Sequence, residues 1–437
     1  MNIYPTIEAM LHYAGAHLLL DELDYVYARN SIMELLGLNA YEEYEINDAE
    51  IEEMTVPDEL VDTLLTYATS QNPLDEDKRR ELSLKLVAAV LKRPGEIADL
   101  FSSLPRPKGF EWLSDYGYKS GYIRTATKKW EAKNTKGRLE VAYTGAQPKG
   151  DNKKYPACRF CRENEGYGAN LLMRAVPLDL GDERMFFYYK KNPVVQGHAN
   201  IVAEYHRPLE IGRAALHKMF DFVAAMPSWF IAAKNGKHEK YVVGSRFTPL
   251  HKAKDKNKFK SAEYPYVNVT VVDWYIGTVR LLCTNREKLI EYSEKLINMW
   301  NSSERETAVC VRKIDSEYCV ELMFLGRGKS PAAEYSNLAT FGGVLQYMGV
   351  FGLDKEKETQ LKAIEKFVAK EEKFSPAKLE GGMSIHADMI GRLLASAGKE
   401  KPTQLEAELD VKDEVNKTLE NALISLSEPI EELYTKF

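Results

Sequence analysis

Apolar side chains recur every three or four positions through most of the first hundred residues. In residues 2–37 the repeat includes Ile7, Leu11 and Leu18, which would share one face of a helix. This spacing is typical of amphipathic helices that bury one side. Residues 40–55 are strongly acidic instead, and they predict a solvated connector. The pattern as a whole predicts helices over 2–37, 59–68 and 77–91.

The periodicity changes near Tyr116, where runs rich in β-branched and aromatic residues replace the helical repeat. Strands are predicted over 122–124, 139–143, 184–189, 198–203, 308–312 and 318–324. Helices are predicted over 214–225 and 286–300. Strands and helices segregated in this way, after a helical start, are typical of an α+β fold with an antiparallel sheet flanked by helices.

Composition narrows the class of protein. The 437 residues suffice for two or three domains, and 44% hydrophobic and 28% charged residues are ordinary for a globular chain. A net charge of −6 gives no reason to expect a nucleic-acid partner. No apolar run reaches membrane-spanning length, and no secretory signal opens the chain, so no membrane partner is expected. Five scattered cysteines do not form a disulfide framework, which favours a reducing, cytoplasmic location.

The most specific chemistry lies in a Cys-x-x-Cys pair, Cys158 and Cys161. This spacing brings two thiolates within reach of one metal ion, and a distant histidine can add a third ligand. His206 is the candidate for that ligand, and the fourth position is left to water, His198 or His251. Zinc is the ion that this donor set suits. The alternative, a reduced cysteine pair without metal, stays open. In both cases we expect the two cysteines to lie close together.

The same stretch, Tyr155–Tyr167, reads YPACRFCRENEGY. It resembles the signature of class II galactose-1-phosphate uridylyltransferases, the firmicute-type branch of the histidine-triad superfamily. A second segment, Trp274–Leu281, reads WYIGTVRL and is similar to a strand of that family. Weaker similarity extends over nearly the whole chain.

The resemblance implies a fold and a set of partners. The fold would be a duplicated histidine-triad-type antiparallel sheet flanked by helices. The domains would be a helical N-terminal region over 1–110, one uridylyltransferase-like half over 111–300, and a second half with a helical tail over 301–437. The ligands would be a UDP-hexose and a hexose 1-phosphate, with zinc as the metal. The resemblance also implies a homodimer.

Catalysis in the family depends on a histidine that attacks the α-phosphorus and carries the uridylyl group. Neutral imidazole suits this role because it is nucleophilic near neutral pH. The family motif Gly-Gly-Ser-x-x-Ser-His-x-His-x-Gln-Gly-Gly precedes a Phe-Pro-Met-Glu-Lys-Ala segment. Here residues 242–253 read VVGSRFTPLHKA, which allows two alignments. One places His251 at the nucleophile. The other aligns Thr248–Ala253 with the later segment, so that the histidine block is absent. Both alignments lose the glutamine.

We expect the second alignment, because it matches more residues. It predicts that His251 lies on a solvent-facing loop among Lys252, Lys254 and Lys256, away from Arg174 and Arg280. His251 is nevertheless the one candidate for a nucleophile. By the same resemblance, substrate oxygens would be bound by Arg124, Lys128, Asn164, Arg174 and Arg280.

Three functional hypotheses follow from the resemblance, and the third of them is a transferase with a changed donor and a different catalytic group. The first is a divergent uridylyltransferase-like protein that handles a UDP-hexose and a hexose 1-phosphate, with a degenerate active site. The second is a catalytically inactive pseudoenzyme that binds a nucleotide sugar, a sugar phosphate or a protein partner.

Overall fold

The computed structural model describes residues 2–124, 129–134, 137–143, 155–302, 305–326, 343–353, 419–421, 423 and 424. Lys128 and most of the predicted C-terminal half lie outside these residues. The chain divides into two compact units. The first unit contains 1–125, 152–193 and 199–206, and the second contains 126–151, 194–198 and 207–437. The predicted domain boundaries after residues 110 and 300 stay predictions.

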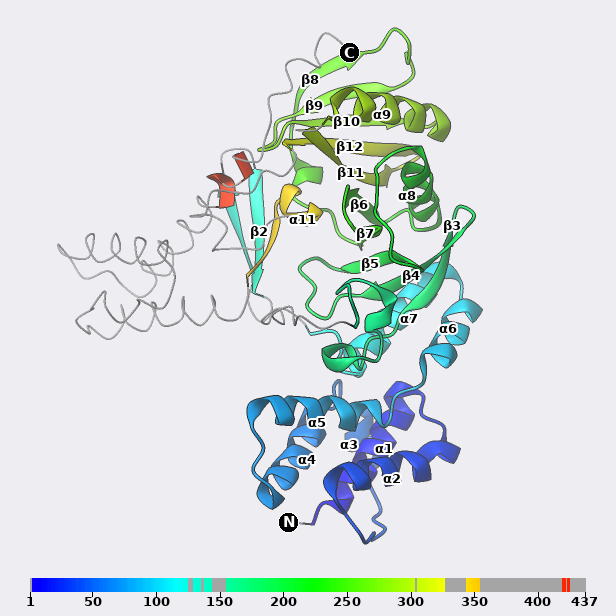
Figure 1. The fold of residues 1–437 in the computed structure, drawn as a ribbon, viewed down its shortest axis with the longest axis vertical. Helices are drawn as coiled ribbons and strands as arrows, with labels where there is room; N and C mark the ends of the chain where they lie inside the picture. The colour runs from blue at the N-terminus through cyan, green and yellow to red at the C-terminus, as the bar shows by residue number, and fades with distance from the viewer. Residues whose placement is uncertain are drawn as a thin grey trace, which may run out of the picture. The chain divides into compact units, whose positions relative to one another are not determined.

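The first unit begins with helices and ends with three strands (Figure 1). The helices are α1 (Tyr4–Leu18), α2 (Tyr25–Leu36), α3 (Asp48–Glu52), α4 (Asp58–Gln71), α5 (Glu76–Ala88), α6 (Pro94–Ser103) and α7 (Arg106–Lys119). The short 3₁₀ turns are η1 (Glu22–Asp24), η2 (Arg162–Asn164) and η3 (Gly168–Asn170). The strands β3 (Val176–Leu180), β4 (Glu183–Tyr189) and β5 (Ala199–Ala203) pair antiparallel in that order.

The helical start of the chain is confirmed, with differences in detail. The predicted helix over 2–37 is two helices, because α1 ends where Leu19 takes a left-handed backbone conformation (φ 59°). The acidic connector contains the short helix α3. The predicted strand at 122–124 is wrong. Tyr122 is buried, and its hydroxyl donates to the Tyr189 carbonyl. The apolar pattern that predicted a strand therefore reflects the burial of this turn, which does not pair in a sheet.

The second unit contains a large antiparallel sheet. Its strand order is β7 (Lys240–Gly244), β6 (Phe230–Lys234), β11 (Arg305–Ile314), β12 (Glu317–Gly326), β10 (Thr278–Cys283), β9 (Asn268–Val272) and β8 (Asp255–Lys260). The predicted pairing of 308–312 with 318–324 is confirmed by the β11–β12 register. The α+β class is therefore correct. The predicted duplication of a histidine-triad unit stays a prediction.

Two helices cover one face of this sheet (Figure 1). They are α8 (Arg213–Ala225) and α9 (Arg286–Trp300). The predicted bounds of α9 are confirmed, because the Asn285 side chain accepts a hydrogen bond from the Lys288 backbone N–H and caps the helix. Trp300 of α9 packs against Phe324 of β12, which places the even-numbered side chains of β12 on the helical face.

The opposite face of the sheet is covered by strands and short helical segments of the same unit. The covering elements are β2 (Gly137–Tyr143), which pairs with β1 (Lys129–Asn134), then α11 (Val344–Tyr347), β13 (Val350–Leu353) and the 3₁₀ turn η4 (Leu250–Lys252). Strand β13 pairs parallel with β2. Apolar residues of these elements form one buried cluster with Cys310 and Met323 of the sheet. This face holds the odd-numbered residues of β12, and Glu321 is among them. In the described part of the chain, no helix is both long enough and apolar enough to cross a membrane.

Candidate metal centre and buried histidine cluster

The cysteine pair lies in the first unit, in the turn that leads into η2. One side chain fixes this turn. The Asn164 amide nitrogen donates to the carbonyls of both Cys158 (2.6 Å) and Cys161 (2.8 Å). A single buried amide that satisfies two backbone carbonyls holds the cysteines in one conformation. Asn164 was predicted to bind substrate, and the structure shows its amide nitrogen bound to the cysteine turn.

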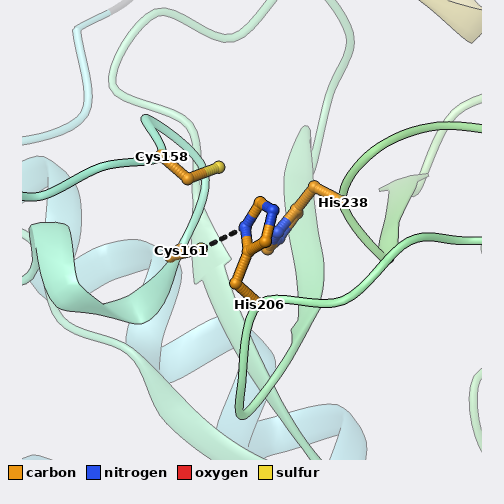
Figure 2. A group of neighbouring side chains, drawn as sticks. All are labelled: Cys158, Cys161, His206 and His238. Carbon is orange, nitrogen blue, oxygen red and sulfur yellow. Dashed lines mark hydrogen bonds between the residues drawn. The ribbon is translucent and has the colours of Figure 1, made fainter.

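Three metal-binding side chains meet at this turn. Ligand atoms of Cys158, Cys161 and His206 lie within 4.8 Å of one another, which confirms that the two cysteines are close together. The Cys161 Sγ atom is 3.3 Å from His206 Nδ1 (Figure 2). A tetrahedral zinc ion with ordinary bond lengths would set a sulfur–nitrogen distance of about 3.5 Å. The donor types and the spacing therefore fit a zinc site. Burial, together with a hydrogen bond to Cys158, raises the pKa of the Cys161 thiol to about 12.

Two further histidines belong to the second unit. His198 Nδ1 accepts a hydrogen bond from the Val194 backbone N–H (3.3 Å). Figure 2 also labels His238, which sequence reasoning missed because no motif marks it. Within its own unit, the loop of His238 is bound to the segment that directly follows His206. The Glu239 N–H donates to the Arg207 carbonyl at 2.6 Å. A role for His198 as the fourth metal ligand stays a prediction.

His251 lies in the second unit, and its predicted position is wrong. Its side chain is 1% exposed and does not face solvent. The reason is the backbone of η4, because the Leu250 N–H donates to the Met348 carbonyl and the Leu250 carbonyl accepts from Arg280. These bonds pull the turn onto the sheet. His251 is consequently close to Arg280, which was expected to be remote.

Both imidazole nitrogens of His251 have neighbours. Nδ1 accepts a hydrogen bond from the Thr248 backbone N–H (3.1 Å). Nε2 lies 3.3 Å from Glu321 Oε2 and 3.4 Å from Cys310 Sγ. The rings of Phe230 and Phe247 contact the imidazole edge-on. His251, Cys310 and Glu321 form a second group whose ligand atoms lie within 4.8 Å of one another.

The charge in this second group is balanced by arginines. Glu321 faces Arg280 on β10 and Cys310 on β11 in the sheet register. Its Oε1 accepts from Arg280 Nε (2.9 Å) and from Arg312 (3.4 Å). Burial alone would raise the pKa of Glu321, but His251, Arg312 and Arg280 outweigh it and hold the pKa at about 2. Glu321 is thus an ionised carboxylate that two guanidinium groups neutralise.

The ring of His251 is neutral, and its two nitrogens are contacted by other groups of the protein. Burial lowers the pKa of its imidazole to about 3, so the ring is neutral near neutral pH. Because Nδ1 accepts a hydrogen bond, the single ring proton is on Nε2. That proton is directed at Cys310 Sγ, and Glu321 Oε2 lies 3.3 Å from the same nitrogen. Neither nitrogen offers a free lone pair to a metal ion or to a phosphorus atom.

The remaining predicted substrate-binding residues also have protein partners. Arg124 forms an ion pair with Asp58 (2.5 Å). Arg174 Nε donates to the Lys92 carbonyl (2.9 Å), and its other donors bind nearby carbonyls. Arg280 donates to Asp255 as well as to Glu321 and the Leu250 carbonyl. A role for these residues in substrate binding stays a prediction, as it does for Lys128, which lies outside the described residues.

These observations define an α+β protein with a Cys/Cys/His group of zinc-site type in one unit and a sealed ionic group in the other. No model of a protein family matches the chain. The chain is, however, similar to curated galactose-1-phosphate uridylyltransferases, as its signature stretch predicts. That of Caldanaerobacter subterraneus subsp. tengcongensis is 24% identical, over 95% of this chain and 92% of the relative. That of Fusobacterium nucleatum subsp. nucleatum is 26% identical, over 71% of this chain and 67% of the relative.

The galactose-1-phosphate uridylyltransferase of Halalkalibacterium halodurans is 25% identical, over 69% of this chain and 66% of the relative. Among solved structures, yeast Ap4A phosphorylase Apa2 in complex with Ap4A covers 62% of this chain and 92% of its own, with 12% identity and a TM-score of 0.38. That likeness is too distant to carry an argument.

Proposed function

We propose that this protein is a divergent galactose-1-phosphate uridylyltransferase-like protein that binds a UDP-hexose or a hexose 1-phosphate and does not transfer a uridylyl group through His251. The binding part of the proposal is supported by the similarity to curated transferases over 95% of the chain. The catalytic part is supported by one observation, the burial of the His251 imidazole with both nitrogens contacted.

The chemistry of uridylyl transfer explains why this observation matters. A histidine nitrogen must place its lone pair about 3–3.5 Å from the α-phosphorus before attack. The phosphorus–nitrogen bond then forms as the bond to the hexose 1-phosphate oxygen breaks. Nε2 of His251 donates its proton to Cys310 Sγ beside Glu321, and Nδ1 accepts the Thr248 N–H with its lone pair. Loss of the family glutamine from the sequence agrees with this reading, because a donor to the phosphoryl oxygens is gone.

A second candidate function is active uridylyl transfer through another group. The length of the similarity to working transferases favours it, because a chain that keeps most of a fold can keep its reaction. It requires a nucleophile other than His251, or a second state in which η4 leaves the sheet. Both requirements are experimentally accessible.

We also propose that Cys158, Cys161 and His206 hold a zinc ion. Sulfur and imidazole nitrogen donors at this spacing support zinc over magnesium or calcium, which prefer oxygen ligands. The metal would crosslink the cysteine turn to the end of β5, which lies 42 residues away in sequence (203 − 161). Its contribution here is structural, and no step of the reaction depends on it.

Label exchange between glucose 1-phosphate and UDP-glucose tests the proposal, because it needs only the first half-reaction. We expect no exchange above a blank without protein, in the wild type and in His251→Asn alike. Asn is chosen because its amide oxygen can accept the Thr248 N–H and keep the turn folded. His217→Asn is the matched control, since His217 lies on the helical face of the same unit.

Ligand binding is measured separately, by calorimetry and by the shift in melting temperature with UDP-glucose, UDP-galactose and galactose 1-phosphate. Binding without exchange supports the proposal. Exchange that disappears in His251→Asn and persists in His217→Asn would contradict its catalytic part. Exchange that survives in both variants would favour the second candidate, and absence of any binding would refute the binding part.

A further inference from the structure

An apolar patch lies uncovered on the helical part of the first unit. Leu23 is 91% exposed, Val26 is 59% exposed and Tyr27 is 68% exposed. Their spacing of three and four residues places them on one side of the η1–α2 segment. Contiguous exposed apolar side chains of this size are typical of interaction sites rather than of ordinary surface.

The patch cannot turn inward, because α2 already uses its other side. Ala28, Ile32 and Leu36 are buried at a spacing of four residues and pack into the unit. Rotating α2 to bury Val26 and Tyr27 would expose these three. The apolar patch is therefore a second face of an anchored helix, and it is available to a partner.

The surroundings of the patch are acidic. Residues 1–60 contain fourteen Asp and Glu residues, one Arg and no Lys. The single Arg29 is already bound to Glu8 through both side-chain oxygens. Glu22 and Asp24, beside the patch, are exposed. Burial raises the pKa of Tyr25, and the carboxylates of Glu22 and Asp48 raise it further. The second effect is the one expected where the electrostatic potential is negative.

A groove lies beside the same helix. It has a volume of about 420 Å³ and runs between α2 and α5. Ser31, Glu34 and Leu35 line it from α2, and Lys85 and Ala88 line it from α5. Ser31 and Glu34 follow Tyr27 by four and seven residues, so they continue its side of the helix. Patch and groove together follow the 12 residues of α2, about 18 Å of helix.

We propose that this surface binds a basic amphipathic helix of a partner protein. Aliphatic side chains of that helix would pack on Leu23, Val26 and Tyr27, and one of these aliphatic side chains would enter the groove. Its lysines or arginines would face Glu22, Asp24 and Glu34. This is helix-in-groove recognition, in which apolar anchors give affinity and the charged rim selects the partner.

The negative charge around the patch disfavours other partners that an exposed apolar surface could bind. Anionic lipid headgroups and nucleic-acid phosphates would be repelled by the acidic rim. A second copy that pairs this surface with itself would bring the two acidic rims together. A basic partner removes the repulsion instead of adding to it.

Binding of a fluorescent helical peptide of leucine and lysine, with leucines on one face, tests the proposal by anisotropy. The same peptide with glutamate in place of lysine is the charge control. The triple variant Leu23→Ser/Val26→Ser/Tyr27→Ser should weaken binding by at least about tenfold, since it removes the anchors. Glu22→Gln/Asp24→Asn should weaken binding about threefold to tenfold and reduce its salt dependence.

The matched control is Glu42→Gln/Glu43→Gln, which removes two exposed charges of the same acidic region that do not belong to α2. It should change the affinity by less than about twofold. All these positions are exposed, and far-UV circular dichroism verifies that each variant is folded. Equal binding by the wild type and the triple variant, or equal binding of the two peptides, would overturn the proposal. So would a concentration-dependent dimer that is lost in the triple variant and that excludes the peptide, because it would assign the surface to a second copy.

Discussion

The two groups of potential metal ligands both contain cysteine and histidine, but they differ in burial and in charge. Cys158, Cys161 and His206 lie in a surface turn with a half-exposed thiol and an exposed imidazole. The group of His251, Cys310 and Glu321 is fully buried, and two arginines neutralise its carboxylate. In the first group soft sulfur and nitrogen donors converge. In the second, guanidinium groups already bind the carboxylate that a metal ion would need as a ligand. Proximity of ligand atoms alone therefore does not define a metal site.

The largest expected effect concerns metal content. Cys158→Ser/Cys161→Ser should reduce bound zinc from about one per chain to near zero, because both thiolates are lost. Cys310→Ala should leave the zinc content unchanged, since two arginines already bind the carboxylate of the second group. Elemental analysis of protein purified without chelator measures both. His198→Ala and His238→Ala, assayed in the same way, identify any further ligand. Equal loss of zinc from the Cys310 variant would remove the distinction between the two groups.

The second expected effect is on stability. Glu321→Gln leaves Arg280 and Arg312 buried without their carboxylate, and it should lower the free energy of unfolding by about 3–5 kcal/mol. Glu317→Gln, on the same strand and without a buried partner charge in the described contacts, should change it by less than about 0.5 kcal/mol. Urea denaturation measures both values. Similar stabilities for the two variants would mean that the ionic group contributes little to folding.

The smallest expected effect in the range tested, pH 7 to 5, is a pH dependence of stability. The pKa of His251 is lowered to about 3 in the folded protein and is about 6.5 in the unfolded chain. The unfolded state therefore binds more protons between these values, and stability falls as the pH decreases from about 6.5 toward 3, by up to about 1.4 kcal/mol per pH unit. The pKa of Glu321 is about 2 in the folded protein, so below about pH 4.3 its carboxylate also binds more protons in the unfolded chain. Glu321 therefore also makes the stability fall as the pH decreases.

His251→Asn removes the first of these two titrations. Its stability should depend less on pH than that of the wild type between pH 7 and 5. Urea denaturation at several pH values measures the slope. A slope equal to that of the wild type would show that His251 is not buried as a neutral ring.

The contrast between local and long-range signals explains what the sequence could predict. The Cys158–Cys161 pair and the capped helix α9 are encoded within a few residues, and both are confirmed. The Glu321 group joins residues 251, 280, 310 and 321 through strand register, and no local spacing marks it. For the same reason His251 was expected in solvent: its neighbouring lysines indicate a surface loop, while the contact of Leu250 with Met348, nearly a hundred residues later, decides its burial.

The parallel pairing of β2 with β13 has a consequence for how the protein is made. Residue 350 leaves the ribosome 207 residues after residue 143 (350 − 143). At about 5–20 residues per second, that interval lasts about 10–40 s. Until it ends, β13 cannot pair with β2, and the layer they form over Cys310 and Met323 is incomplete. Strand β2 therefore waits for its parallel partner until every strand of the large sheet has been synthesised.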